Sequence, residues 1–237
     1  MSVFAHLVER LADLLQPLFG ASAAAAAIVL FTALVRLLLH PLSRAAARGQ
    51  KARAELQPRV AELRRKHAKD PERLKRAVLE LHAEEKVSPL SGCLPSLLQL
   101  PAFFLLYHVF SSSEVGGRAN GLLSHQLLAA PLGGRWADAL GDGGLLGGAG
   151  LVYAVLFAVV AGVATFSYRL TRRSIAAHPV APAGDGEQVP GVGAITRVMP
   201  FMSFFTLVTV AVVPLAAALY VVTSTTWSAV ERAVLQR

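Results

Sequence analysis

Long apolar stretches dominate this chain and restrict what it can fold into. A helix needs about 20 mostly apolar residues to cross a bilayer, and five blocks satisfy this requirement, at 21–42, 92–110, 148–168, 194–212 and 213–230. Apolar residues make up 54% of the 237 residues and charged residues only 16%, whereas soluble domains carry about 25% charge. The sequence therefore predicts an all-α integral membrane protein with five transmembrane helices, and it argues against an ordinary soluble enzyme.

The distribution of Lys and Arg predicts how these helices are oriented. The segment 43–91 holds 13 of the 23 Lys and Arg residues, and 169–193 holds three more, whereas 111–147 holds two. Because basic loops stay in the cytoplasm, 43–91, the loop 169–193 and the C-terminus are expected there, with the N-terminus and the outer loop 111–147 outside. Only Val213-Pro214 separates the last two blocks, and proline does not sit in an undisturbed helix, so a tight helical hairpin is expected rather than one kinked span.

Residues 1–20 carry apolar side chains at every third or fourth position. Glu9 and Asp13 stand where the apolar core of a signal peptide would lie, so a signal peptide is not expected. The pattern fits an amphipathic helix that lies in the outer membrane interface. A plain helical lead-in to the first span is the alternative.

The basic segment 43–91 shows two apolar repeats, Leu56, Val60 and Leu63, then Leu74, Val78 and Leu81. Asp70 between them suits a helix N-cap and Pro71 the first helical position. An antiparallel helical hairpin with basic outer faces is therefore expected. It is either a topology signal near anionic lipid heads or a docking surface for a ribosome or nascent chain. Sequence-specific binding of nucleic acid is not expected because no aromatic residue is interleaved. The basic residues of this expected docking face are Arg59, Arg64, Arg65, Lys66, Lys69, Arg73, Lys75 and Arg76.

Arg36 is the one charge in the first apolar block, and none of the five blocks contains Asp or Glu. An arginine inside a bilayer costs about 2.5–3.5 kcal/mol on insertion scales. Arg36 is therefore expected to reach the head groups, bind a lipid phosphate, or face a wet cavity between helices. Polar residues in other blocks favour the cavity, because polar groups need partners in lipid; they are Gln99, Thr165, Ser167, Tyr168, Thr223, Ser224 and Thr225.

Several short motifs occur in a characteristic order along the chain. They are Leu34-Val35-Arg36-Leu37 with His40-Pro41-Leu42, Ser88-Pro89-Leu90-Ser91-Gly92-Cys93-Leu94-Pro95 with Leu98-Gln99-Leu100-Pro101, Met199-Pro200-Phe201, and Pro214 through Leu219-Tyr220. Together they resemble the YidC-type membrane protein insertases, the family that includes the mitochondrial and chloroplast insertases, over about residues 25 to 232. The chain departs from the family pattern at Val221 and at Ser224-Thr225, where the family often has Trp and Ser-Asn, and a glutamine near the end of the family pattern is replaced by Glu231 or its neighbours.

The resemblance implies an insertase core at 21–237 in the compact five-span form, located in the cell membrane. Such a protein inserts and helps fold client membrane proteins through a hydrated groove that opens to the cytoplasm and to lipid. Arg36 would attract acidic client tails, without ATP hydrolysis, a cofactor or a metal. Newly made membrane proteins and anionic lipids are the implied partners, with the ribosome and the Sec translocon as further candidates. The implied groove residues are Arg36, Gln99, Thr165, Ser167, Tyr168, Tyr220, Thr223, Ser224 and Thr225.

Two other function classes fit a polytopic membrane protein. A small transporter would usually show paired repeats, and no internal repeat is detected in the sequence. A membrane-bound enzyme would need a cluster of carboxylates or metal ligands, and the sequence brings none together. An insertase, which is not an enzyme, is therefore the favoured function.

Overall fold

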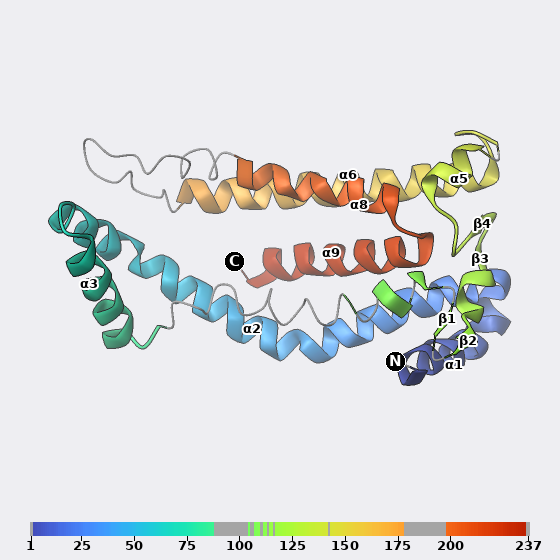
Figure 1. The fold of residues 1–237 in the computed structure, drawn as a ribbon, viewed down its shortest axis with the longest axis horizontal. Coiled ribbons are helices and arrows are strands. Elements are labelled where there is room, and N and C mark those ends of the chain that lie inside the picture. Colours follow the sequence, from blue (N-terminus) through green and yellow to red (C-terminus); the bar gives the residue numbers. More distant parts are fainter. Residues whose placement is uncertain are drawn as a thin grey trace.

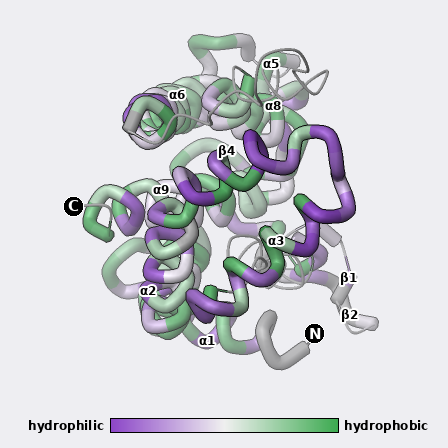
Figure 2. The backbone as a smooth tube through the Cα atoms, turned by 90° about the vertical axis from the view of Figure 1, so that its left-hand side faces the viewer, coloured by the Kyte–Doolittle hydropathy of each residue, from purple (hydrophilic) through white to green (hydrophobic). Residues whose placement is uncertain are grey.

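The long helices form layers around α9. The computed structural model describes residues 2–87, 104, 107–109, 111–112, 114–115, 117–141, 143–177 and 198–235. Its main helices are α1 (Ser2–Phe19), η1 (Gly20–Ser22), α2 (Ala23–Lys66), α3 (Pro71–Glu84), α6 (Gly148–Ala177), η3 (Met199–Phe204), α8 (Phe205–Val212) and α9 (Leu215–Leu235). Helix α9 lies in the middle, with α2 on one side and α6 and α8 on the other (Figure 1), and the view along the long axis shows the same layers (Figure 2).

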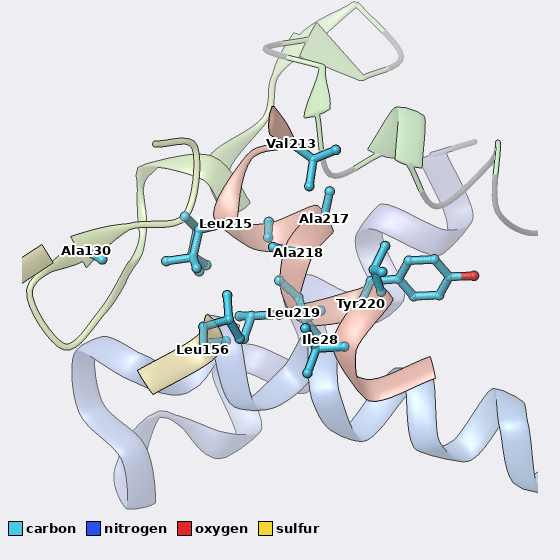
Figure 3. Packing of buried hydrophobic residues seen from close by; sticks show 14 of the residues in the cluster. Ile28, Ala130, Leu156, Val213, Leu215, Ala217, Ala218, Leu219 and Tyr220 are labelled. Carbon is cyan, nitrogen blue, oxygen red and sulfur yellow. The ribbon is translucent and has the colours of Figure 1, made fainter. Parts of the chain in front are cut away.

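The start of α9 forms the centre of the core. Leu215, Ala216, Ala217 and Ala218 are all 0% exposed, as is Ile28 of α2. Figure 3 shows Leu215, Ala217, Ala218 and Ile28 gathered around the first turns of α9. Small residues allow helix backbones to approach closely, which is how helices gain van der Waals contact in a membrane. The alanine run therefore explains why α9 can occupy the central layer.

The N-terminal end of α9 is hydrogen-bonded to the segment before α6. The backbone N–H of Leu215 donates to the carbonyl of Gly134, and that of Ala216 donates to the carbonyl of Leu132, both at 2.9 Å. The first N–H groups of a helix have no partner within it, so these bonds satisfy two of them. The Tyr153 hydroxyl donates to the same Gly134 carbonyl at 2.7 Å.

The segment 111–147, expected to be the outer loop, contains short helices and strands. Two antiparallel strand pairs and two short helices occur in the described residues; they are β1 (Glu114–Val115) with β2 (Arg118–Ala119), η2 (Gly121–Ser124), β3 (Gln126–Leu127) with β4 (Ala130–Pro131), and α5 (Trp136–Gly141). In the register, Glu114 faces Ala119 and Gln126 faces Pro131. The chain is mostly helical, and these short strands are the exception to the all-α expectation.

The two C-terminal apolar blocks form two helices. Helix α8 ends at Val212, and Val213 is extended with φ −82° and ψ 157°. Helix α9 begins at Leu215, directly after Pro214. The proline therefore marks a break between helices, as its missing N–H and fixed φ predict. Helices α8 and α9 run in opposite directions from this turn (Figure 1).

Helix α2 is longer than the sequence analysis expected. The first span was predicted to end at 42, but α2 continues from Ala23 to Lys66 with Pro41 and Pro58 inside it. After a turn, the Asp70 carboxylate accepts the Arg73 N–H at 3.0 Å and caps α3. A proline removes one hydrogen bond of a helix, and the rest of a 44-residue helix tolerates this loss. The span and the first half of the basic segment are therefore one helix.

Helix α1 packs beside the start of α2 (Figure 1). Gly20 has φ +52°, a left-handed conformation that glycine adopts without steric cost, and it separates α1 from α2. Val8 and Ala12 are buried in the core, whereas Leu14 and Leu18 are more than 70% exposed. Helix α1 is thus amphipathic and distinct from α2, and its position at the membrane interface stays a prediction.

Two helical stretches of the described residues are long and apolar enough to cross a membrane. They are His6–Lys66, which runs through α1, η1 and α2, and Gly148–Ala176, which lies in α6. Met199–Val212 is a shorter apolar helix. Most of the predicted span 92–110 lies outside the described residues. The number of spans is therefore supported in part, and the count of five stays a prediction.

Candidate functional site

Arg36 lies where α2 faces α9. Its guanidinium Nη2 donates a hydrogen bond to the Ser224 hydroxyl across the helix–helix contact. Ser224 is 6% exposed and Arg36 is half-buried. The neighbouring Leu34 and Leu37 on α2 are exposed, so the arginine is directed toward α9 and these leucines are directed away from the protein. Arg36 therefore makes a contact within the protein, and a wet cavity beside it stays a prediction.

A second polar pair lies one helical turn further along α2. His40 Nδ1 and Glu231 Oε1 are 2.6 Å apart, joining α2 to α9 again. The Glu231 side chain is 10% exposed and that of His40 36%. Residues four apart share one face of a helix, and α2 and α9 run in the same direction (Figure 1). Arg36 and His40 on one helix therefore face Ser224 and Glu231 on the other.

None of the five apolar blocks contains Asp or Glu, yet α9 brings Glu231, which lies just beyond the last block, near the Arg36 guanidinium, and Tyr220 also lies near it. The last apolar block ends at 230 in the sequence, but α9 continues to Leu235 and carries Glu231 back to α2. Tyr220 itself is 4% exposed and lies beside Ile28 in the core (Figure 3). We define the charged site as Arg36, His40, Tyr220, Ser224 and Glu231.

Several predicted groove residues hydrogen-bond within their own helix. Thr223 donates to the carbonyl of Leu219 at 2.7 Å, and Thr225 donates to that of Val221 at 2.8 Å. Thr165 in α6 donates to the carbonyl of Ala161 at 2.7 Å in the same way. Such bonds satisfy a hydroxyl without a partner from another helix. The hydrogen bonds of these threonines stay within their own helices and do not reach Arg36. Their place in the lining of a groove stays a prediction.

The remaining predicted groove residues lie elsewhere. The Tyr168 ring packs against η3, with centroids 5.3 Å from Phe201 and 6.0 Å from Phe204. Ser167 is buried in α6 at 6% exposure. Gln99 lies outside the described residues. Tyr168 therefore belongs to an aromatic contact between α6 and η3 rather than to the charged site.

The basic residues of the predicted docking face are all exposed. They are Arg59, Arg64, Arg65, Lys66, Lys69, Arg73, Lys75 and Arg76. Two have acidic partners, since Arg59 pairs with Glu85 and Arg73 Nε lies 3.2 Å from Asp70. Apolar and hydrophilic residues alternate along α3 in Figure 2. Among the described residues, no group of three or more His, Cys, Asp or Glu could hold a metal ion.

Sequence reasoning missed His40 and Glu231 as site residues. The available signal was the spacing of polar residues at 36 and 40 in one apolar helix and at 224 and 231 in another. Positions four and seven apart share a helix face, so each pair marks a polar stripe that needs a partner.

Sequence comparison with known proteins shows which family this chain is similar to. A family model of the 60Kd inner membrane proteins matches residues 14–237. The membrane protein insertase YidC of Clostridium perfringens is 44% identical over 84 residues, which are 35% of this chain and 35% of that protein. The same-named protein of Anaeromyxobacter sp. is 42% identical over 101 residues, 43% of this chain and 18% of that protein. The similar segments thus span about a third or less of these relatives' own length.

The family match covers nearly the whole chain and includes every helix that forms the charged site. The relatives carry the name of the family whose sequence motifs this chain resembles. The chain therefore belongs to the 60Kd inner membrane protein family, the YidC-type membrane proteins.

Proposed function

We propose that this chain is a membrane protein insertase of the cell membrane. It has five spans, with the N-terminus outside and the C-terminus in the cytoplasm, and it is not an enzyme. Family membership supports this function. The observation that carries it is a guanidinium, Arg36, held half-buried between α2 and α9 in an otherwise apolar part of the chain.

Arg36 acts on the polar part of an incoming protein. A polar or acidic tail that enters the bilayer loses its hydration, which costs several kcal/mol per charge. A fixed positive charge offsets part of this cost by Coulomb attraction, which is stronger in a low-dielectric site than in water. The tail therefore lies partway across the membrane, in a hydrated groove that includes Arg36, Gln99, Tyr220 and Ser224. The groove opens to the cytoplasm and to lipid.

The client's apolar segment supplies the free energy of insertion. Transfer of about 20 apolar residues to lipid is favourable, and the membrane potential adds to it for charged tails. ATP, a cofactor and a metal are therefore not required. The groove is closed on the outside, and the bonds that tie Leu215 and Ala216 to the segment at 132–134 support this closure.

The exposed basic residues at the end of α2 and on α3 form the recruitment surface. Their positive charge attracts anionic lipid heads, at about 1 kcal/mol per basic residue near the surface. The same charge attracts a translating ribosome and its nascent chain. The Sec translocon is a further candidate partner.

Reconstituted vesicles test the proposal. The purified chain is placed in proteoliposomes with two single-span clients that differ only in their tails, one with acidic residues and one with the corresponding amides. Arg36→Ala should reduce insertion of the acidic client at least about tenfold more than that of the neutral client, since about 1.4 kcal/mol is a factor of ten. Arg44→Ala, which removes an exposed arginine from the same helix, is the matched control. The proposal fails if the wild-type chain inserts neither client, or if Arg36→Ala impairs both equally.

A further inference from the structure

The charged site holds an acid of its own, Glu231, which meets α2 one helical turn from Arg36. Glu231 is 10% exposed, so protein rather than water surrounds its carboxylate. Its Oε1 lies 2.6 Å from His40 Nδ1. Arg36 lies one turn from His40 on α2, and the charge of Glu231 acts on its guanidinium. The proposed client ligand of Arg36 is also a carboxylate. Glu231 is thus the same chemical group as the ligand, and it meets α2 one helical turn from the same cation.

The charges of Arg36 and Glu231 determine how the site acts on a client carboxylate. Arg36 contributes +1 and Glu231 contributes −1, so the pair is neutral. A client carboxylate that approaches Arg36 is attracted by the guanidinium and repelled by Glu231. Both charges lie in a partly buried site where solvent screens them less than it would on the surface. Glu231 therefore weakens the site's preference for acidic clients.

We propose that Glu231 is a specificity-determining residue that competes with client carboxylates for Arg36. His40 is the positioning residue, because its contact draws the carboxylate toward α2 one turn beyond the arginine. The inference rests on the proposed function, and it sets which clients the site accepts. With Glu231 in place, the groove accepts tails that range from neutral to acidic and releases the acidic ones.

A purely structural role for Glu231 makes a different prediction. A clamp between α2 and α9 would affect every client alike, because its loss would loosen the helix contact and leave the charge preference of the site unchanged. The ratio of acidic to neutral client binding separates these roles. Total activity does not, because both roles change it.

The test uses the full chain in nanodiscs of zwitterionic lipid and two fluorescent peptides. Each peptide has the same apolar segment, preceded by four Asp in one and four Asn in the other. Glu231→Gln should raise the preference for the Asp peptide about tenfold. His40→Gln should lower it, because the freed carboxylate can turn toward Arg36. Asp13→Asn makes the same acid-to-amide change at an exposed position of α1 and should leave the ratio unchanged.

Each outcome decides the proposal. An unchanged ratio in Glu231→Gln overturns it, and so does an equal rise in Asp13→Asn, which would assign the effect to net charge. Glu231→Asp keeps the charge, so it should keep the wild-type ratio even if the shorter side chain lowers stability. Insertion of the neutral client by the wild-type chain tests the proposed function by itself. If that insertion fails while the binding ratio still responds to Glu231→Gln, the proposed function is wrong and the competition stands.

Discussion

Replacing Ser224 by alanine removes the hydroxyl that accepts the Arg36 hydrogen bond. Hydrogen bonds to charged groups contribute about 1.5–3 kcal/mol in proteins, but pairs inside membranes average about 0.6 and reach about 1.7 kcal/mol. The acceptor is almost fully buried, which favours a value near the upper limit. The negative charge of Glu231 continues to act on the guanidinium, which keeps the loss below that limit. We expect a coupling of about 1–1.5 kcal/mol between Arg36 and Ser224.

A double-mutant cycle measures this coupling. The wild type, Ser224→Ala, Arg36→Ala and the double variant are unfolded reversibly in mixed micelles, and the fluorescence of Trp227 in α9 reports the transition. The cycle isolates the pair from what each side chain does alone. Ser228→Ala, which removes a half-buried hydroxyl one turn further along α9, should show a coupling to Arg36 near zero. The reasoning is refuted if Ser224 and Ser228 couple to Arg36 equally.

Two local predictions concern the helix ends. A Cβ at Gly150 would clash with the carbonyl oxygen of Gly144, so Gly150→Ala should lower the midpoint of thermal unfolding. Gly162 has open space around it, so Gly162→Ala should leave the midpoint unchanged or raise it. An equal effect of the two substitutions would contradict the packing at the start of α6. Asp70→Ala removes the side chain that caps α3 and should cost about 1 kcal/mol, measured as faster amide hydrogen exchange at Arg73, while Asp70→Asn, which keeps a capping oxygen, should exchange nearly as slowly as the wild type.

The sequence was most informative where local chemistry decides the structure. Pro214 marks the break between α8 and α9 because proline acts within one turn of the chain. Asp70 and Pro71 mark the start of α3 for the same reason. It was less informative about the length of α2, because no local pattern indicates that the helix continues unbroken through Pro41 and Pro58. A proline in a long helix loses one bond of many, so its effect depends on the packing around it.

The charged site was only partly predictable. Arg36 stands out in any hydropathy pattern, and Ser224 was among the polar residues expected near it. The contact between His40 and Glu231 depends on how α2 packs against α9, which no local pattern encodes. The threonines show the limit of such a pattern, because a hydroxyl in an apolar helix can bond to its own backbone and need no cavity.

The polar contacts of α9 explain why its fold and its site cannot be separated. At its N-terminal end, backbone N–H groups bond to the segment at 132–134. In its middle, Thr223 bonds within the helix while the adjacent Ser224 reaches α2, and near its C-terminal end Glu231 reaches α2 as well. Apolar contact between helices is not directional, so an alanine-rich surface alone would let α9 slide along α2. The contacts of Ser224 and Glu231 fix that register, and the same contacts set the position of Arg36. A substitution that shifts α9 by one turn would therefore move Ser224 and Glu231 away from Arg36 together, changing the charge of the site as well as its packing.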